Sequence, residues 1–149
     1  MNATATMTNP TVAEPRTTTT ESRPTPLWRT GAKAGVVAAV ATTVVAAVAL
    51  AADVPLALDG EQIPLAGFAQ MTLLGAAIGV VLAKALSRWS AMPRRTFVAA
   101  TVALTALSTV PDLAAPATAA SKIVLIATHL VAAAIVIPAI AGRLADRTR

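Results

Sequence analysis

"GAKAGVVAAVATTVVAAVALAAD", residues 31–53, decides the fold of this chain. Residues 34–52 carry no charged side chain, and Thr42 and Thr43 are their only polar members. At 1.5 Å per residue this segment makes a helix of about 28 Å, close to the ~30 Å hydrocarbon thickness of a bilayer. It has no polar face at the 3.6-residue spacing of a soluble amphipathic helix. We therefore predict a membrane-spanning helix near residues 31–53.

Three further apolar runs follow, and they predict helices near residues 65–87, 95–110 and 121–143. The third is the shortest, at about 24 Å of charge-free helix, and we expect Pro111 and Pro116 to end it. The whole chain of 149 residues is 56% hydrophobic and 13% charged, whereas a soluble domain has about 25% charged residues. The predicted fold is all-α, an antiparallel four-helix transmembrane bundle.

The positions of the basic residues predict the orientation. Of 12 Lys and Arg residues, only Lys122 falls on the side of the first and third loops. Because cytoplasmic loops are enriched in Lys and Arg, we expect a plasma-membrane protein with both termini in the cytoplasm. The pI is near 11.2. Basic residues gathered on one side of a membrane set the topology and attract anionic lipid, so they do not require a nucleic-acid partner, and none is predicted.

The segments outside the helices divide the chain. Residues 1–27 are rich in Thr and Pro and predict a disordered cytoplasmic tail before a transmembrane domain at 28–145 and a short tail at 146–149. An alternative for the first helix is cleavage after the small residues 49–51, although the stretch that precedes the apolar run is longer than a signal peptide's charged region.

In the loop "DVPLALDGEQIPL", residues 53–65, Asp59 and Gly60 predict a two-residue turn in a short extracytoplasmic hairpin, with Leu56 near Ile63.

Small residues recur at every fourth position of the first two predicted helices. Membrane helices associate by close backbone approach, which small side chains permit. We expect these ridges to pack against each other or the bundle axis, and homodimerisation through one ridge stays open. The glycines in the ridges are Gly31, Gly35, Gly67, Gly75 and Gly79.

Three polar side chains fall at a similar depth in three of the predicted helices: Gln70, Thr105 and His129. They predict a hydrogen-bonded layer within the membrane, with a role in ligand or proton handling as the alternative. No Asp or Glu is predicted inside a span, and His129 is the only histidine, so no catalytic, cofactor or metal site is predicted. Pro138 is a candidate kink in the fourth helix.

Residues 107–144, "LSTVPDLAAPATAASKIVLIATHLVAAAIVIPAIAGRL", carry a resemblance. Through Val110-Pro111, His129-Leu130 and Val136-Ile137-Pro138 they resemble a domain-of-unknown-function family of small actinobacterial four-helix membrane proteins. The resemblance covers residues 28–145. It implies plasma-membrane residence and four spans, and it implies no reaction, substrate or catalytic residue.

These observations predict a non-enzymatic structural or accessory membrane protein. No nucleophile, base and orienting acid converge in the sequence, so no enzymatic activity is expected. The alternative is a small oligomeric transporter or channel with Gln70 and His129 along the pathway. The expected partners are the lipid bilayer and either further copies of the chain or another membrane protein, with no cofactor.

Overall fold

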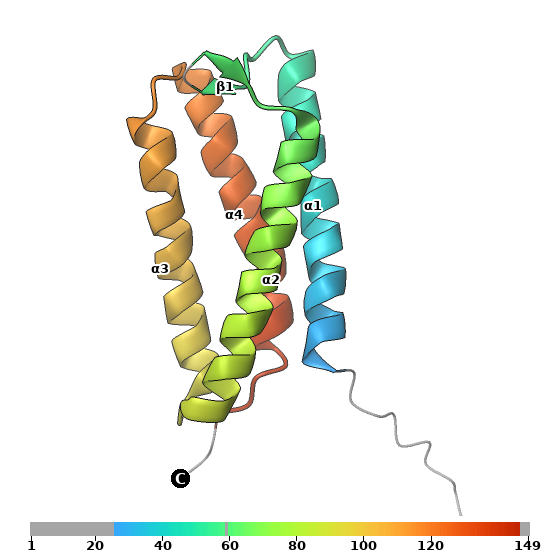
Figure 1. Cartoon of the computed structure of the whole chain (residues 1–149), viewed down its shortest axis with the longest axis vertical. Coiled ribbons are helices and arrows are strands. Elements are labelled where there is room, and N and C mark those ends of the chain that lie inside the picture. The colour runs from blue at the N-terminus through green and yellow to red at the C-terminus, as the bar shows by residue number, and fades with distance from the viewer. Residues whose placement is uncertain (1–25, 59, 147–149) are drawn as a thin grey trace, which may run out of the picture.

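The computed structural model describes residues 26–58 and 60–146, which form four long antiparallel helices in one bundle (Figure 1). Each helix is long and apolar enough to cross a membrane by length and composition. The predicted all-α four-helix bundle is therefore confirmed, whereas the predicted tail at 1–27 falls almost wholly outside the described residues. The helices are α1 (Leu27–Ala51), α2 (Leu65–Trp89), α3 (Pro93–Ala114) and α4 (Ala119–Ala141).

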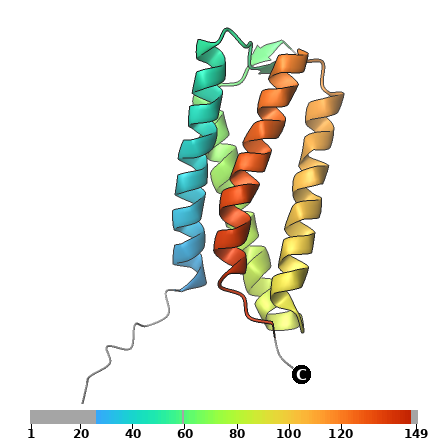
Figure 2. The same cartoon turned by 180° about the vertical axis from the view of Figure 1, so that it is seen from behind.

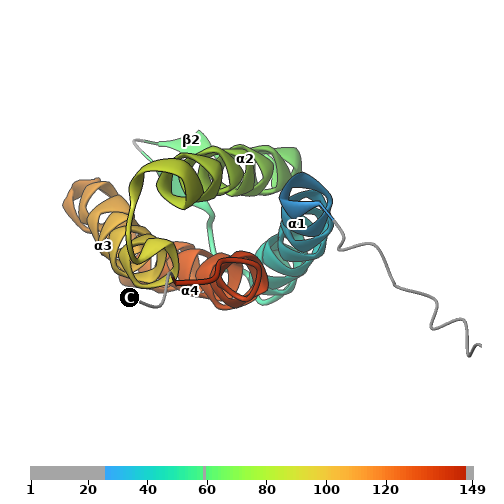
Figure 3. The same ribbon diagram turned by 90° about the horizontal axis from the view of Figure 1, so that it is seen from below.

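The two ends of the bundle differ in what they carry (Figures 1 and 2). At the end that we call the termini end, α1 begins, α4 ends and a short loop joins α2 to α3. The opposite end, which we call the hairpin end, carries the α1–α2 connection and the α3–α4 loop. Viewed from the termini end, α1 lies between α2 and α4, and α3 lies beside α4 on the side away from α1 (Figure 3).

A two-stranded hairpin forms the α1–α2 connection. Strands β1 (Ala57–Leu58) and β2 (Glu61–Gln62) pair antiparallel, with Leu58 opposite Glu61. The Ile63 N–H donates to the Leu56 carbonyl at 2.8 Å, and Gly60 has a φ of +83°, which glycine adopts without steric cost. The predicted hairpin and the predicted proximity of Leu56 and Ile63 are both confirmed, whereas Asp59 of the predicted turn lies outside the described residues.

The chain enters this hairpin through a left-handed residue at the end of α1. Asp53 has a φ of +57°, a conformation that Asp tolerates better than most residues. The Val54 N–H then donates to the Ala49 carbonyl at 3.0 Å, and the Asp53 N–H donates to the Leu50 carbonyl at 3.1 Å. This pair of bonds is a Schellman motif, which satisfies the last carbonyls of α1 and turns the chain back over the bundle.

The predicted end of the third helix at Pro111 is wrong. α3 runs 22 residues from Pro93 and contains Pro111 in its last turns. A proline removes one helical hydrogen bond, but the Ala115 N–H still donates to the Pro111 carbonyl at 2.8 Å, so the helix continues. α3 is therefore about 33 Å long rather than about 24 Å, and Asp112 belongs to the helix rather than to the loop.

The start of α4 also differs from the sequence-based expectation. The helix begins at Ala119 rather than near residue 121, because Thr118 is the N-cap residue and its Oγ1 accepts from the Ser121 N–H at 3.1 Å. The Ser121 hydroxyl donates to the carbonyl of Pro55, which ties α4 to the hairpin connection. Pro138 lies inside α4, and its proposed kink stays a prediction.

Small residues of α1 form the centre of the packing, but their spacing differs from the predicted ridge. Four residues turn an α-helix by about 400°, so a strict four-residue ridge drifts off the packed face. In agreement, Ala39 is buried, Thr43 and Ala47 are half-buried, and Ala51 is exposed. The buried positions are separated by one, three or four residues, which keeps them on one side of the helix: Gly31, Ala34, Gly35, Ala38, Ala39, Thr42, Ala46 and Ala49.

Two glycines of α1 allow α2 to approach closely. A Cβ atom on Gly31 would lie 2.0 Å from Cγ2 of Val80, and one on Gly35 would lie 2.9 Å from the Cβ of Ala76. Both distances are shorter than van der Waals contact. The backbones of α1 and α2 therefore lie at a separation that a larger residue at Gly31 would prevent.

The glycines of α2 do not share one role. A Cβ on Gly79 would make ordinary contact with Ile140 of α4 at 3.7 Å, and one on Gly67 would meet only Ile63 and Pro64, just before its own helix. A Cβ on Gly75 would meet no atom within 4 Å. The expected packing of Gly75 is therefore not seen within a single chain, where Gly75 is exposed.

Candidate functional site

A carboxylate and an imidazole lie against each other between α3 and α4, near the hairpin end. Oδ2 of Asp112 lies 3.3 Å from Nδ1 of His129. The Asp112 side chain is 11% exposed and the His129 side chain 35% exposed. We call this arrangement the Asp112–His129 pair. It exists because α3 continues past Pro111 and directs Asp112 towards α4.

The hydrogen bonding of the pair is asymmetric. Nδ1 of His129 also lies 3.0 Å from the carbonyl oxygen of Leu125, one turn earlier in α4. In the tautomer that carries the proton on Nδ1, this N–H donates to the Leu125 carbonyl. Oδ2 of Asp112 is buried and accepts no hydrogen bond among the described residues. In that tautomer the imidazole faces the carboxylate at ion-pair distance while its Nδ1 proton is directed to the backbone.

The ammonium group of Lys122 lies at the end of α3, the helix that carries Asp112. Nζ of Lys122 donates to the carbonyl of Leu113 at 2.7 Å, which places this ammonium at the last turn of α3, next to Asp112 in sequence. A carboxylate and an imidazole at 3.3 Å are chemically able to exchange a proton. Within the described residues, no three His, Cys, Asp or Glu side chains come together as a candidate metal site.

The structure does not join the three residues of the expected polar layer to one another. Thr105 donates to the Thr101 carbonyl of its own helix at 2.9 Å, and His129 contacts Leu125 and Asp112. Gln70 is exposed on α2. Thr105 bonds within its own helix because a helical Thr hydroxyl reaches the carbonyl one turn back, which leaves no free proton for a neighbouring helix.

One hydroxyl pair does join two helices. Oγ1 of Thr42 on α1 lies 3.0 Å from Oγ1 of Thr72 on α2, and Thr42 also donates to the Ala39 carbonyl at 3.1 Å. Since a hydroxyl has one proton, Thr42 accepts the proton of Thr72. The α1–α2 contact thus combines close glycine packing near the termini end with a hydrogen bond deeper in the bundle.

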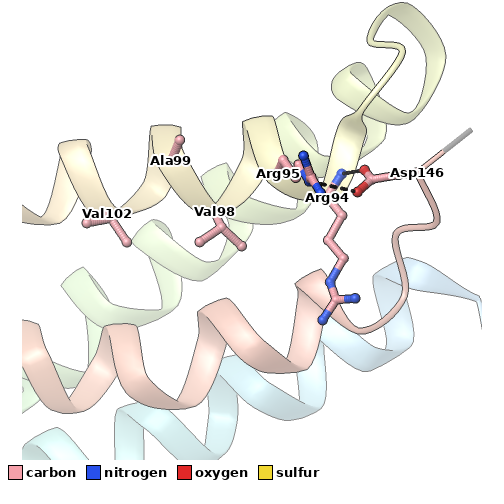
Figure 4. Close-up of a pocket in the computed structure, with 6 residues that line it drawn as sticks. All are labelled: Arg94, Arg95, Val98, Ala99, Val102 and Asp146. Carbon is pink, nitrogen blue, oxygen red and sulfur yellow. Dashed lines mark hydrogen bonds and ion pairs between the residues drawn. The ribbon is translucent and has the colours of Figure 1, made fainter.

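A groove of about 610 Å³ runs along the first turns of α3 (Figure 4). We call it the α3 groove. Its residues are polar at the termini end and apolar beyond it. They are Arg94, Arg95, Val98, Ala99, Val102 and Asp146.

Asp146, from the segment after α4, closes the polar end of this groove. Its Oδ1 accepts the backbone N–H of Arg94 at 2.9 Å, and its Oδ2 lies 3.9 Å from Nε of Arg95. The first N–H groups of a helix have no partner within the helix, so this carboxylate acts as a cap supplied from a distant part of the chain. The contact holds the segment after α4 against the start of α3.

The span that forms this bundle matches a known family. Residues 22–146 match DUF6069, a family of unknown function. The chain belongs to this family. The matched region of this DUF6069 protein contains all four helices, the Asp112–His129 pair and the α3 groove. Membership of an unknown-function family is thus confirmed, while the actinobacterial lineage stays a prediction. No curated protein and no solved structure has a significant match to the chain.

Two acidic residues of this DUF6069 protein were missed by the sequence-based prediction. Asp112 was assigned to a loop because Pro111 was expected to end the helix. A usable signal was present, because Thr101, Thr105, Ser108 and Asp112 follow steps of four, three and four and so share one helical face. Asp146 left no such signal, since its partner lies at the start of another helix.

Proposed function

We propose that this chain is a multi-pass protein of the plasma membrane that acts as a non-enzymatic accessory protein by binding a membrane partner. The apolar side chains on the outside of the bundle support membrane residence. Large residues such as Val40, Met71, Val81 and Leu107 are each at least 60% exposed in the single chain. A bilayer solvates such a surface, whereas water does not.

The charges at the two ends support an orientation with both termini in the cytoplasm. Among the described residues, the hairpin end carries the acids Asp53, Glu61 and Asp112 and one cation, Lys122. The cations of the termini end are Arg29, Lys33, Lys84, Arg88, Arg94, Arg95 and Arg143.

Cysteine labelling tests this orientation, and the natural chain has 0 cysteines to interfere. Glu61→Cys lies in the hairpin and Ala91→Cys in the α2–α3 loop, and both positions are exposed. We expect a membrane-impermeant maleimide to label Glu61→Cys in intact cells and Ala91→Cys only after permeabilisation. The reverse pattern would contradict the orientation.

The packing of α3 carries the proposal of a partner. Its buried residues are Pro93, Phe97 and Asp112, so all of them lie near the ends of the helix. Residues 98–111 are half-buried or exposed throughout. α1, in contrast, is buried along most of its length. The middle of α3 is therefore available to pack against another membrane helix without disturbing the rest of the bundle.

A photocrosslinking amino acid at Leu107 tests this surface in native membranes. Val40 on α1 is the matched control, because the two side chains are 64% and 60% exposed. We expect a discrete protein adduct from position 107 and none from position 40. Adducts with lipid alone at both positions, or the same protein adducts at both, would reject a partner surface on α3.

A second candidate function is supported by the Asp112–His129 pair. Proton-handling membrane proteins commonly place a carboxylate beside a histidine within a span, and this chain has that combination. The candidate is a small oligomeric transporter or channel with Gln70 and His129 lining the pathway. Solute flux in proteoliposomes separates the two candidates. If the chain is an accessory protein, the natural chain and the His129→Ala variant should give the same flux. If it is a transporter, His129→Ala should abolish the pH-dependent flux.

A further inference from the structure

The α3 groove has two chemically different parts that meet at the surface of the bundle. The guanidinium groups of Arg94 and Arg95 lie at one end, and Val98, Ala99 and Val102 lie beyond them. We propose that the α3 groove binds one anionic phospholipid, with its phosphate at the two arginines and an acyl chain along the apolar part. This proposal rests on the membrane residence argued above.

The cationic end of the groove has unused hydrogen-bonding capacity. The guanidinium of Arg94 forms no ion pair or hydrogen bond with any residue in the described ranges, and Figure 4 shows it extending away from Asp146. Arg95 is 79% exposed, and its single charged contact is long, at 3.9 Å. Guanidinium groups bind phosphate through paired N–H donors, so the free guanidinium of Arg94 offers donors for a phosphate, and Arg95 adds a second positive charge at this end of the groove.

The apolar part of the groove runs along α3 in the direction that an acyl chain takes from its headgroup. From Arg94 to Val102 the helix rises about 12 Å, which leads from the charged end into the apolar middle of α3. Val98 and Val102 project on the same side of α3 as the Arg94 guanidinium (Figure 4). A free anion makes no favourable contact with these apolar side chains, whereas the acyl chain of a phospholipid covers them.

Asp146 determines where the phosphate binds. Its carboxylate already accepts the Arg94 backbone N–H, so the helix N-terminus itself is occupied. The carboxylate also repels a second anion at that point. The phosphate is therefore expected at the side-chain guanidinium of Arg94, on the side away from Asp146, while Arg95 adds positive charge at the same end of the groove.

Native mass spectrometry of the full chain in detergent tests the proposal, with phosphatidylglycerol or phosphatidylcholine added at equal concentrations. We expect one phosphatidylglycerol to be retained per chain and phosphatidylcholine to be lost. The double variant Arg94→Gln, Arg95→Gln should bind phosphatidylglycerol about thirtyfold more weakly, because each of the two cations near a membrane surface contributes on the order of 1 kcal/mol. Lys84→Gln, Arg88→Gln removes the same charge from α2 at the same end and should retain the lipid.

A second variant tests the apolar part without changing charge. Ala99→Phe fills the groove at an exposed position, so it should reduce phosphatidylglycerol retention while circular dichroism still reports a helical protein. The proposal would be overturned if both lipids were retained equally, or if the two charge variants lost phosphatidylglycerol equally. It would also be overturned if inorganic phosphate displaced the lipid and Ala99→Phe left lipid retention unchanged. A chain that is folded and monomeric in buffer without detergent would instead reject membrane residence itself.

Discussion

Nδ1 of His129 lies 3.3 Å from Oδ2 of Asp112, and this contact joins α4 to the buried end of α3. The carboxylate oxygen is buried and accepts no hydrogen bond from the described residues, so the imidazole is its nearest polar neighbour given by the structure. Replacing one member of such a pair lowers the free energy of unfolding more than replacing both, because a single replacement leaves the other polar group buried without a partner.

We therefore expect His129→Leu to lower the free energy of unfolding by about 1–3 kcal/mol. Adding Asp112→Leu to His129→Leu should restore most of this loss, because the unpaired carboxylate is then removed. Detergent-solubilised protein titrated with a denaturing detergent and followed by circular dichroism gives both values. Thr105→Val is the control and should change little, because Thr105 bonds only to its own helix. An additive loss in the double variant would argue against a coupled pair.

Gly31 is expected to be sensitive to the smallest possible side chain. The Cβ of Gly31→Ala would lie 2.0 Å from Cγ2 of Val80, a stiff β-branched residue, so α1 and α2 must separate. We expect a loss of about 1–3 kcal/mol, partly recovered by Val80→Ala. Gly75→Ala meets no neighbour in the single chain and gains helix propensity, so its thermal midpoint should be unchanged or slightly raised. Strong destabilisation by Gly75→Ala, together with loss of an oligomer in crosslinking, would instead reveal packing between copies.

Thr42 and Thr72 should behave as one unit. Thr72→Val removes the donor of the hydrogen bond between α1 and α2, while Thr42→Val removes its acceptor. Hydrogen bonds between membrane helices contribute about 0.6 kcal/mol on average, so each single variant should lose roughly that amount. The double variant should lose no more than the larger single loss, as measured by the same unfolding titration. Full additivity would show that the two hydroxyls act independently.

Asp146 should stabilise the start of α3 through its hydrogen bond to the Arg94 N–H. Asp146→Ala removes this cap, and we expect a loss of about 1 kcal/mol. Asp146→Asn keeps an acceptor oxygen and should lose less. Hydrogen exchange of the first turn of α3 is the direct measurement, with Asp53→Asn at the hairpin end as a control that should leave that turn unchanged.

The sequence predicted those parts of the fold that depend on local composition. The apolar runs predicted four helices, because a segment of this length without charges is stable only where its backbone bonds are satisfied internally. The hairpin was predicted down to Leu56 and Ile63, because a two-residue turn fixes the register of its strands. The two buried glycines of α1 were also among the residues expected to pack.

The sequence predicted less of the candidate site, because its contacts join distant segments. Pro111 was expected to end a helix that in fact continues, and this expectation concealed the buried position of Asp112. Gln70 and Thr105 matched His129 in depth, but depth does not fix the rotation of a helix about its own axis.

The sequence by itself thus determined that this chain forms four apolar helices, how they are connected and where its charges lie. Only the tertiary structure decided which face of each helix is buried, and with it the pairing of Asp112 with His129 and the contact of Asp146 with α3. The physical reason is that apolar composition acts along each segment alone, whereas helix rotation is set by the neighbours against which side chains and backbones can approach closely.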